Sequence, residues 1–309
     1  MNAKLLLDKL EKITTWKRRE QRAPNKPLLL LYALARIEQG KTRLFKYSEV
    51  HEPLGNLLRE FGPPRTVVHP EYPFWRLEND GVWQVAWPPP LQVRERRTQD
   101  VSAATLMEEE VEAGFPPQVQ KLLEKDPDLR RRVARMLLDA HFPTTLHEDI
   151  QSAVGLDTEW ETTRRRVRDP EFRSKVLAAW RNRCGVCGFD VRLGRTSLAL
   201  DAAHIRWKQA GGPDVENNGL ALCALHHRLF DRGAFTVQPA TRKAEQGPME
   251  VLVSDLTAGT RGLQESLMRF HGSGLLLPEK EDQRPESAHL LWHRKEVFRG
   301  PAHDSAGPG

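Results

Sequence analysis

Residues 184–235 read CGVCGFDVRLGRTSLALDAAHIRWKQAGGPDVENNGLALCALHHRLFDRGAF, a stretch that gathers most of the chain's metal-binding side chains. Two pairs of ligand residues in it share a spacing of two intervening residues: Cys184 with Cys187, and Cys223 with His226. A tight turn or the start of a helix can present such a pair to one tetrahedral ion. Because four protein ligands leave no open coordination position, we predict a structural Zn²⁺ here. Three unrelated core cysteines are the alternative.

Three further polar residues of this stretch, His204, Asn218 and His227, are then free for another task. His204 lies at the end of an apolar, strand-like run from Leu198 to Ile205, and His227 lies near the start of a predicted helix. A near-neutral imidazole suits proton transfer or metal binding at cellular pH. Core histidines with satisfied rings are the alternative interpretation.

The order and spacing of these residues resemble the HNH, or ββα-metal, nuclease motif with its zinc knuckles. The resemblance covers residues 184–235 and implies a β-hairpin with the first histidine, a loop with the asparagine and a helix with the last histidine. It implies that His204 is the general base, that Asn218 fixes the loop and orients this base, and that His227 binds a catalytic Mg²⁺, Mn²⁺ or Ni²⁺. Many members place a metal ligand directly before the base, where this chain has Ala203. Asp201 would then substitute, either directly or through water.

Outward from the motif, the first half of the chain contains three informative blocks, APNKPLLLLYAL (23–34), EYPFWRLENDGVWQV (71–85) and RERRTQD (94–100). The first predicts a helix that opens at Pro27, closes at Gly40 and is buried on nearly every side. In the second block, aromatic runs on either side of Asn-Asp-Gly predict a β-hairpin.

Together with the downstream nuclease motif, these blocks resemble the sulfur-binding domain of McrA-like type IV restriction endonucleases that cut phosphorothioated DNA. Sulfur in place of a phosphate oxygen accepts hydrogen bonds poorly, so a shallow apolar cavity favours it. We expect Tyr72 and Pro73 to wall this cavity, and Lys26, Arg96 and Arg97 to hold the remaining phosphate charge. Tyr72 and Pro73 in a strand that simply enters the core are the alternative.

Length and composition indicate the class of protein and the number of domains. A chain of 309 residues, with 39% hydrophobic and 29% charged residues, suits a folded protein of two domains and argues against disorder. We predict an α+β protein of two domains. Residues 1–157 form a DNA-reading domain of helices and a β-hairpin, together with a helical spacer. Residues 158–309 form a zinc-containing HNH nuclease domain. The longest apolar run is too short for a membrane span, and the N-terminal residues do not read as a secretory signal. We therefore expect a cytoplasmic protein, and three cysteines exclude a disulfide framework.

The sequence thus predicts a metal-dependent endonuclease that recognises phosphorothioated double-stranded DNA and cuts nearby. Two alternatives stay open: a nuclease that reads methylated DNA bases, and a catalytically decayed, zinc-stabilised DNA-binding protein, which Ala203 motivates. One HNH site cuts one strand, so a double-strand break needs a homodimer or two independent visits.

Overall fold

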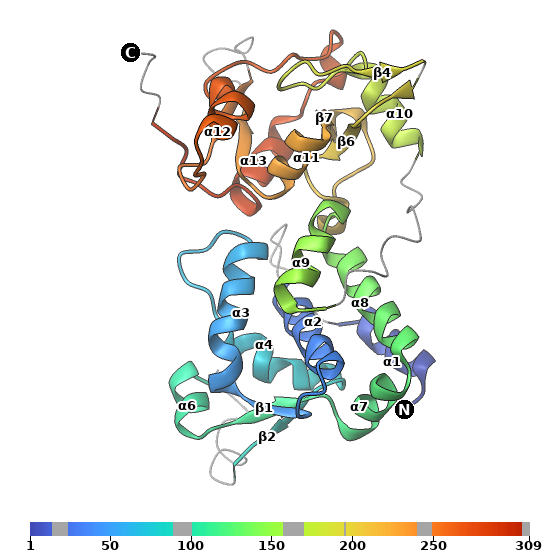
Figure 1. The fold of residues 1–309 in the computed structure, drawn as a ribbon, viewed down its shortest axis with the longest axis vertical. Coiled ribbons are helices and arrows are strands. Elements are labelled where there is room, and N and C mark those ends of the chain that lie inside the picture. The colour runs from blue at the N-terminus through green and yellow to red at the C-terminus, as the bar shows by residue number, and fades with distance from the viewer. Residues whose placement is uncertain (14–23, 89–100, 157–169, 195, 240–248, 305–309) are drawn as a thin grey trace. The chain divides into compact units, whose positions relative to one another are not determined.

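The computed structural model describes residues 1–13, 24–88, 101–156, 170–194, 196–239 and 249–304 (Figure 1). The chain divides into two compact units, Met1–Thr163 and Arg164–Gly309. The domain boundary that we predicted after residue 157, and the predicted phosphate contacts Arg96 and Arg97, lie outside the described residues.

The described part of the first unit is mainly helical. Its elements are α1 (Ala3–Glu11), α2 (Asn25–Glu38), α3 (Tyr47–Phe61), α4 (Glu71–Arg76), the 3-10 turn η1 (Leu77–Asp80), α6 (Ala103–Glu108), α7 (Pro117–Lys125), α8 (Pro127–His141), the 3-10 turn η2 (Thr144–Leu146) and α9 (His147–Val154). Helix α2 packs against α3, α4, α7, α8 and α9. Its side chains from Leu28 to Leu31 are fully buried, which confirms the helix expected after Pro27 and its buried character.

A small antiparallel sheet joins distant segments of this unit. Strand β3 (Glu112–Gly114) lies between β1 (Leu44–Lys46) and β2 (Gln84–Ala86), and Ala113 faces both Phe45 and Val85. Through β3, the sheet therefore joins β1, which precedes α3, to β2, which follows η1.

The hairpin that we predicted around Asn79-Asp80-Gly81 is wrong. Residues 71–80 form α4 and η1 instead, with Phe74 and Leu77 buried at helical spacing. Pro73 suits the first turn of a helix because its fixed φ is helical and its missing N–H has no partner to lose there. Gly81, at φ 68°, ends the helical segment in the left-handed region, so the Asn-Asp-Gly turn is a helix terminus. The strand β2 follows it and pairs with β3.

The second unit alternates short strands and helices. Its elements are α10 (Pro170–Ala179), β4 (Arg192–Leu193), β5 (Thr196–Ser197), β6 (Leu200–His204), η4 (Lys208–Ala210), η5 (Glu216–Asn218), β7 (Gly219–Cys223), α11 (Ala224–Asp231), β8 (Phe235–Gln238), β9 (Glu250–Val253), α12 (Arg261–Ser266), η6 (Met268–Phe270), η7 (Glu281–Gln283) and α13 (Ser287–Glu296). The strands pair as three antiparallel hairpins in the described residues: β4 with β5, β6 with β7, and β8 with β9.

The β6–β7 hairpin forms the centre of this unit. All five residues of β7 are buried, and the hairpin contacts both α10 and α11 (Figure 1). A strand covered on both faces reads as a continuous apolar run, which explains the sequence GLALC at 219–223. The register pairs Leu200 with Cys223 at one end and His204 with Gly219 at the other. The predicted hairpin, loop and helix arrangement is confirmed, and the chain is an α+β protein.

The described residues contain no helix that combines the length and the apolar character required to cross a bilayer.

Candidate functional site

Four side chains converge at one end of the β6–β7 hairpin. Cys184 and Cys187 belong to the turn after α10, Cys223 ends β7, and His226 lies in the first turn of α11. One potential ligand atom of each lies within 4.8 Å of all the others. The Cys187 and Cys223 sulfurs are 4.0 Å apart, close to the separation of about 3.8 Å that tetrahedral Zn–S bonds give. The four residues predicted to bind Zn²⁺ form a cluster compatible with this ion.

The surroundings of the cluster suit a closed metal site. The His226 Nε2 hydrogen donates to the Ser266 carbonyl at 2.9 Å, which leaves Nδ1 facing Cys223 Sγ at 3.1 Å. Hydrogen bonds with Cys187 and Cys223 lower the pKa of Cys184, whereas hydrogen bonds with Cys184 and Cys223 raise the pKa of Cys187, so these bonds by themselves favour the thiolate at Cys184. The backbone N–H of Gly185 donates to Ala221 in β7 at 2.8 Å and anchors the turn to the hairpin.

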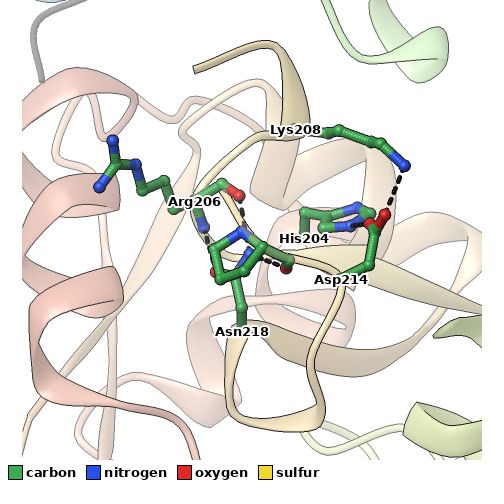
Figure 2. A network of polar contacts seen from close by, with 6 residues as sticks. His204, Arg206, Lys208, Asp214 and Asn218 are labelled. Atoms are coloured by element: carbon green, nitrogen blue, oxygen red, sulfur yellow. Dashed lines mark hydrogen bonds and ion pairs between the residues drawn. The ribbon is translucent and has the colours of Figure 1, made fainter. Parts of the chain in front are cut away.

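His204 lies at the opposite end of the hairpin. Its Nε2 atom is 2.7 Å from Asp214 Oδ1, and the other oxygen of Asp214 accepts a hydrogen bond from Lys208 (Figure 2). The Phe172 ring of α10 stacks on the imidazole, with centroids 4.0 Å apart and planes 12° from parallel. The imidazole is thus held at one edge by a carboxylate and on one face by an aromatic ring.

Sequence reasoning missed Asp214. This residue follows Gly211-Gly212-Pro213, four positions before Asn218, and nothing in that spacing alone directs it toward His204. A Cβ on Gly212 would lie 1.8 Å from the Arg206 carbonyl oxygen, so only glycine lets the loop approach this strand end. The Gly-Gly pair between two polar site residues was the available clue that the loop turns back.

Asn218 is fully buried and fixes the same loop (Figure 2). Its amide nitrogen donates to the carbonyls of Arg206 at 3.0 Å and Pro213 at 2.9 Å, and its oxygen accepts the Arg206 backbone N–H at 2.9 Å. These bonds join the chain just after His204 to the chain just before Asp214. Asn218 acts on the backbone at both sides of the loop.

His227, on α11, lies between two carboxylates. Its Nε2 atom is 3.2 Å from Asp231 Oδ2, one helical turn away, and its Nδ1 atom is 4.0 Å from Asp201 Oδ2. The other oxygen of Asp201 accepts a hydrogen bond from Arg173 Nε at 3.2 Å. Asp231, with 2% of its side chain exposed, fixes the imidazole so that Nδ1 faces Asp201. Asp231 was also missed, although its position four residues after His227 on a predicted helix was a usable sign.

The electrostatics at His204 favour a neutral ring. Burial lowers the pKa of His204, and this effect outweighs the hydrogen bond and charge of Asp214, which act in the opposite direction. Burial raises the pKa of Asp214, but the hydrogen bonds from Lys208 and His204 outweigh it and leave that pKa below the ordinary value. At neutral pH the pair is therefore a carboxylate beside a neutral imidazole.

The first unit places the predicted sulfur-site residues in different surroundings. Tyr72 and Pro73 lie on α4, Pro73 is buried, and the Tyr72 ring stacks on His69 with centroids 4.7 Å apart. The Arg76 guanidinium lies 4.4 Å from the Tyr72 ring centroid, the distance of a cation–π contact. Lys26 forms an ion pair with Asp80 at 2.6 Å, with 15% of the lysine side chain exposed.

Comparison with known families defines the two units. A hairpin, a loop and a helix that carry His204, Asn218 and His227 beside a Cys3His cluster define an HNH-type unit, and residues 184–238 match the HNH endonuclease family. Residues 3–159 match the family described as "ScoMcrA-like, DNA sulfur-binding domain". This match spans half of the chain, and the protein therefore belongs to the ScoMcrA-like DNA sulfur-binding domain family. It joins that domain to an HNH endonuclease domain in one polypeptide.

Several solved structures are similar to about half of the chain. The sulfur-binding domain of ScoMcrA in complex with phosphorothioated DNA has 22% identity and a TM-score of 0.40, over 48% of this chain and 94% of that one. The corresponding domain of SprMcrA, also with phosphorothioated DNA, has 20% identity and a TM-score of 0.41, over 50% and 95%. The type IV phosphorothioation-dependent restriction endonuclease ScoMcrA has 23% identity and a TM-score of 0.38, over 48% of this chain and 27% of its own. No curated protein matches this chain.

Proposed function

We propose that this chain is a restriction endonuclease that recognises phosphorothioate-modified double-stranded DNA and hydrolyses phosphodiester bonds nearby. The observation that carries the proposal is the joining, in one polypeptide, of a DNA sulfur-binding domain with an HNH unit whose His204 is held by Asp214. The first unit selects the DNA and the second cuts it. DNA restriction takes place in the cytoplasm, where we expect the protein to act.

Selection of sulfur in the first unit follows from its weak hydration. An apolar wall formed by Tyr72, with the buried Pro73 next to it in α4, strips water from the modified position, which costs an oxygen more than a sulfur. The difference for one atom is about 1 to 3 kcal/mol, or roughly 5- to 150-fold in affinity. Lys26 already forms an ion pair with Asp80, so it can contact a phosphate only if DNA displaces Asp80. Arg96 and Arg97 remain the other proposed phosphate contacts.

Cleavage in the second unit needs a base for the attacking water and a cation beside the phosphate. His204 accepts the proton of the water, since its neutral form is favoured near pH 7. Asp201 Oδ2 and His227 Nδ1, 4.0 Å apart, would be the protein ligands of a shared divalent ion. Such an ion, Mg²⁺, Mn²⁺ or Ni²⁺, would stabilise the negative charge of the transition state and the leaving oxygen.

The test uses defined duplexes with and without a phosphorothioate, incubated with the full chain and Mn²⁺ and separated on a denaturing gel. We expect cleavage of the modified duplex alone, and equal cleavage of both duplexes would contradict the proposal. A 5-methylcytosine duplex in the same series tests the reading in which a methylated base is the mark. Products resolved on a native gel show whether one strand or both are cut. A cut in both strands would require either a homodimer or two separate binding events by one molecule.

A second function is favoured by one observation. Ala203, directly before His204, is fully buried and offers no ligand atom, so metal binding depends on Asp201 and His227. A protein that binds modified DNA without cutting it would fit a decayed site. Binding of the phosphorothioated duplex without cleavage in Mg²⁺, Mn²⁺ or Ni²⁺ would support this function, and cleavage in any of them would eliminate it.

A further inference from the structure

The contact between Asp214 and His204 fixes the position of the imidazole ring and also determines which ring nitrogen carries the hydrogen. Asp214 is ionised, so its oxygens accept hydrogen bonds and have none to donate. An oxygen 2.7 Å from His204 Nε2 therefore requires the hydrogen of a neutral imidazole to be on Nε2. Nδ1 is then the unprotonated nitrogen, and only an unprotonated nitrogen can take a proton from water.

The loop is built to hold this contact. Asn218 ties the backbone at Arg206 and at Pro213, and the close approach of Gly212 to the Arg206 carbonyl leaves room for no side chain. Lys208 occupies the second oxygen of Asp214 and so prevents the carboxylate from turning (Figure 2). The exposed fractions of the two side chains are 22% for His204 and 27% for Asp214, so water competes only in part.

We propose that Asp214 is a positioning residue for His204, which keeps the imidazole hydrogen on Nε2 and leaves Nδ1 as the atom that accepts the proton of the attacking water. Phe172 completes the arrangement, because its stacked ring restricts rotation of the imidazole plane. The catalytic part of this inference rests on the proposed nuclease function. The part that concerns the hydrogen position does not, and it is measurable without DNA.

The substitution Asp214→Asn separates shape from hydrogen bonding. An asparagine has one acceptor oxygen, and the Lys208 ammonium, a charged donor, binds it in preference to a neutral imidazole. The amide NH₂ then faces Nε2, which must become an acceptor, and the imidazole hydrogen moves to Nδ1. The expected result is a base with its reactive nitrogen blocked. Turnover should fall on the order of 10²- to 10⁴-fold with the KM for DNA unchanged, by analogy with the loss of the orienting carboxylate in a catalytic triad.

The measurement is ¹⁵N NMR of the histidine side chains in the full, zinc-loaded chain, with the His204 signals assigned by their loss in His204→Gln. In the unsubstituted protein above pH 7 we expect a protonated Nε2 and an unprotonated Nδ1, and in Asp214→Asn the reverse. Asp255→Asn, the same change at an exposed carboxylate after β9, is the matched control and should alter neither the signals nor the cleavage rate.

A double variant guards against a merely structural effect. In Asp214→Asn with Lys208→Met, the amide oxygen is released and turns to Nε2, so the hydrogen should return to Nε2 and part of the turnover should recover. An Nδ1 hydrogen in the unsubstituted protein, or no change in Asp214→Asn, would overturn the role of Asp214. A reversal of the ring hydrogen in a protein that cuts no DNA would overturn the nuclease function and support the positioning of His204.

Discussion

The two ends of the β6–β7 hairpin hold their polar side chains in different ways. At the end with Cys223, four ligand atoms lie within 4.8 Å of one another, and close thiolates repel unless a cation neutralises them. At the other end, Asp214 holds the imidazole of His204, and on α11 Asp231 holds the imidazole of His227. The first end is therefore suited to hold an ion, whereas the second is arranged by the protein's own hydrogen bonds.

Removal of a zinc ligand should have the largest effect. Cys184→Ser should lose the bound Zn²⁺ and the cooperative unfolding transition of the second unit, because a structural zinc contributes on the order of 10 kcal/mol, comparable to the whole stability of a domain. Elemental analysis and differential scanning calorimetry report the two quantities. The transition of the first unit is the internal control and should remain. Full zinc content with an unchanged second transition would show that the cysteines are only core residues.

A change at the opposite end should leave the fold intact. His204→Gln should reduce single-turnover cleavage of phosphorothioated DNA on the order of 10²- to 10⁴-fold, because it removes the proton acceptor. Zinc content and the unfolding temperature should stay at their original values. His303→Gln, outside this hairpin, is the matched control. Loss of zinc in His204→Gln would mean that the two ends are not independent.

A smaller effect is expected at the buried partner of His227. Asp231→Asn should lower the affinity for the catalytic divalent ion about 10- to 100-fold, since the carboxylate orients the imidazole. Titration of the cleavage rate with Mn²⁺ measures this, and the rate at saturating Mn²⁺ should be less affected. An unchanged Mn²⁺ requirement would argue against His227 as a ligand.

The smallest effect is a displacement of the pH profile. Because burial lowers the pKa of His204 below its ordinary value of 6.5, the neutral base persists in mild acid. The acid limb of the single-turnover rate should therefore have its midpoint below pH 6.5. Asp214 and Asp231 oppose this displacement and Lys208 assists it. A midpoint above 6.5 would show that the two carboxylates outweigh burial.

The same group makes a small contribution to stability. Below pH 6.5 the unfolded chain takes up a proton that the folded chain resists, so stability falls as the pH drops toward the folded pKa of His204. Above pH 6.5 this penalty is absent. Chemical denaturation at several pH values measures the free energy of unfolding, and its difference from that of His204→Gln gives the contribution of this group.

The sequence predicted the second unit better than the first because its ligand spacing is local. Pairs such as Cys184 with Cys187 have only two residues between them, so a single turn decides their geometry. Asp214 could not be predicted in this way, because its contact with His204 depends on the path of the nine intervening residues, which Asn218 and Gly212 hold in place.

The first unit shows how local patterns mislead when tertiary contacts decide. Aromatic residues beside Asn-Asp-Gly favour a hairpin. Two tertiary interactions instead stabilise a helix followed by a short strand: Phe74 is buried, and Trp83 Nε1 donates a hydrogen bond of 2.8 Å to the Phe74 carbonyl. Lys26 was predicted to contact phosphate from its charge alone. Its partner Asp80 is 54 residues away, a distance in sequence that composition and periodicity do not reveal.

The antiparallel register of β6 has an evolutionary consequence. Side chains alternate between the two faces of a strand, so the deletion of one residue from Leu200–His204 would turn the imidazole to the other face. The turn between β4 and β5 carries no such constraint, since its strands are short and their residues largely exposed. Among descendants of this gene, length variation should accumulate in that turn and be purged from the five-residue strand that follows it.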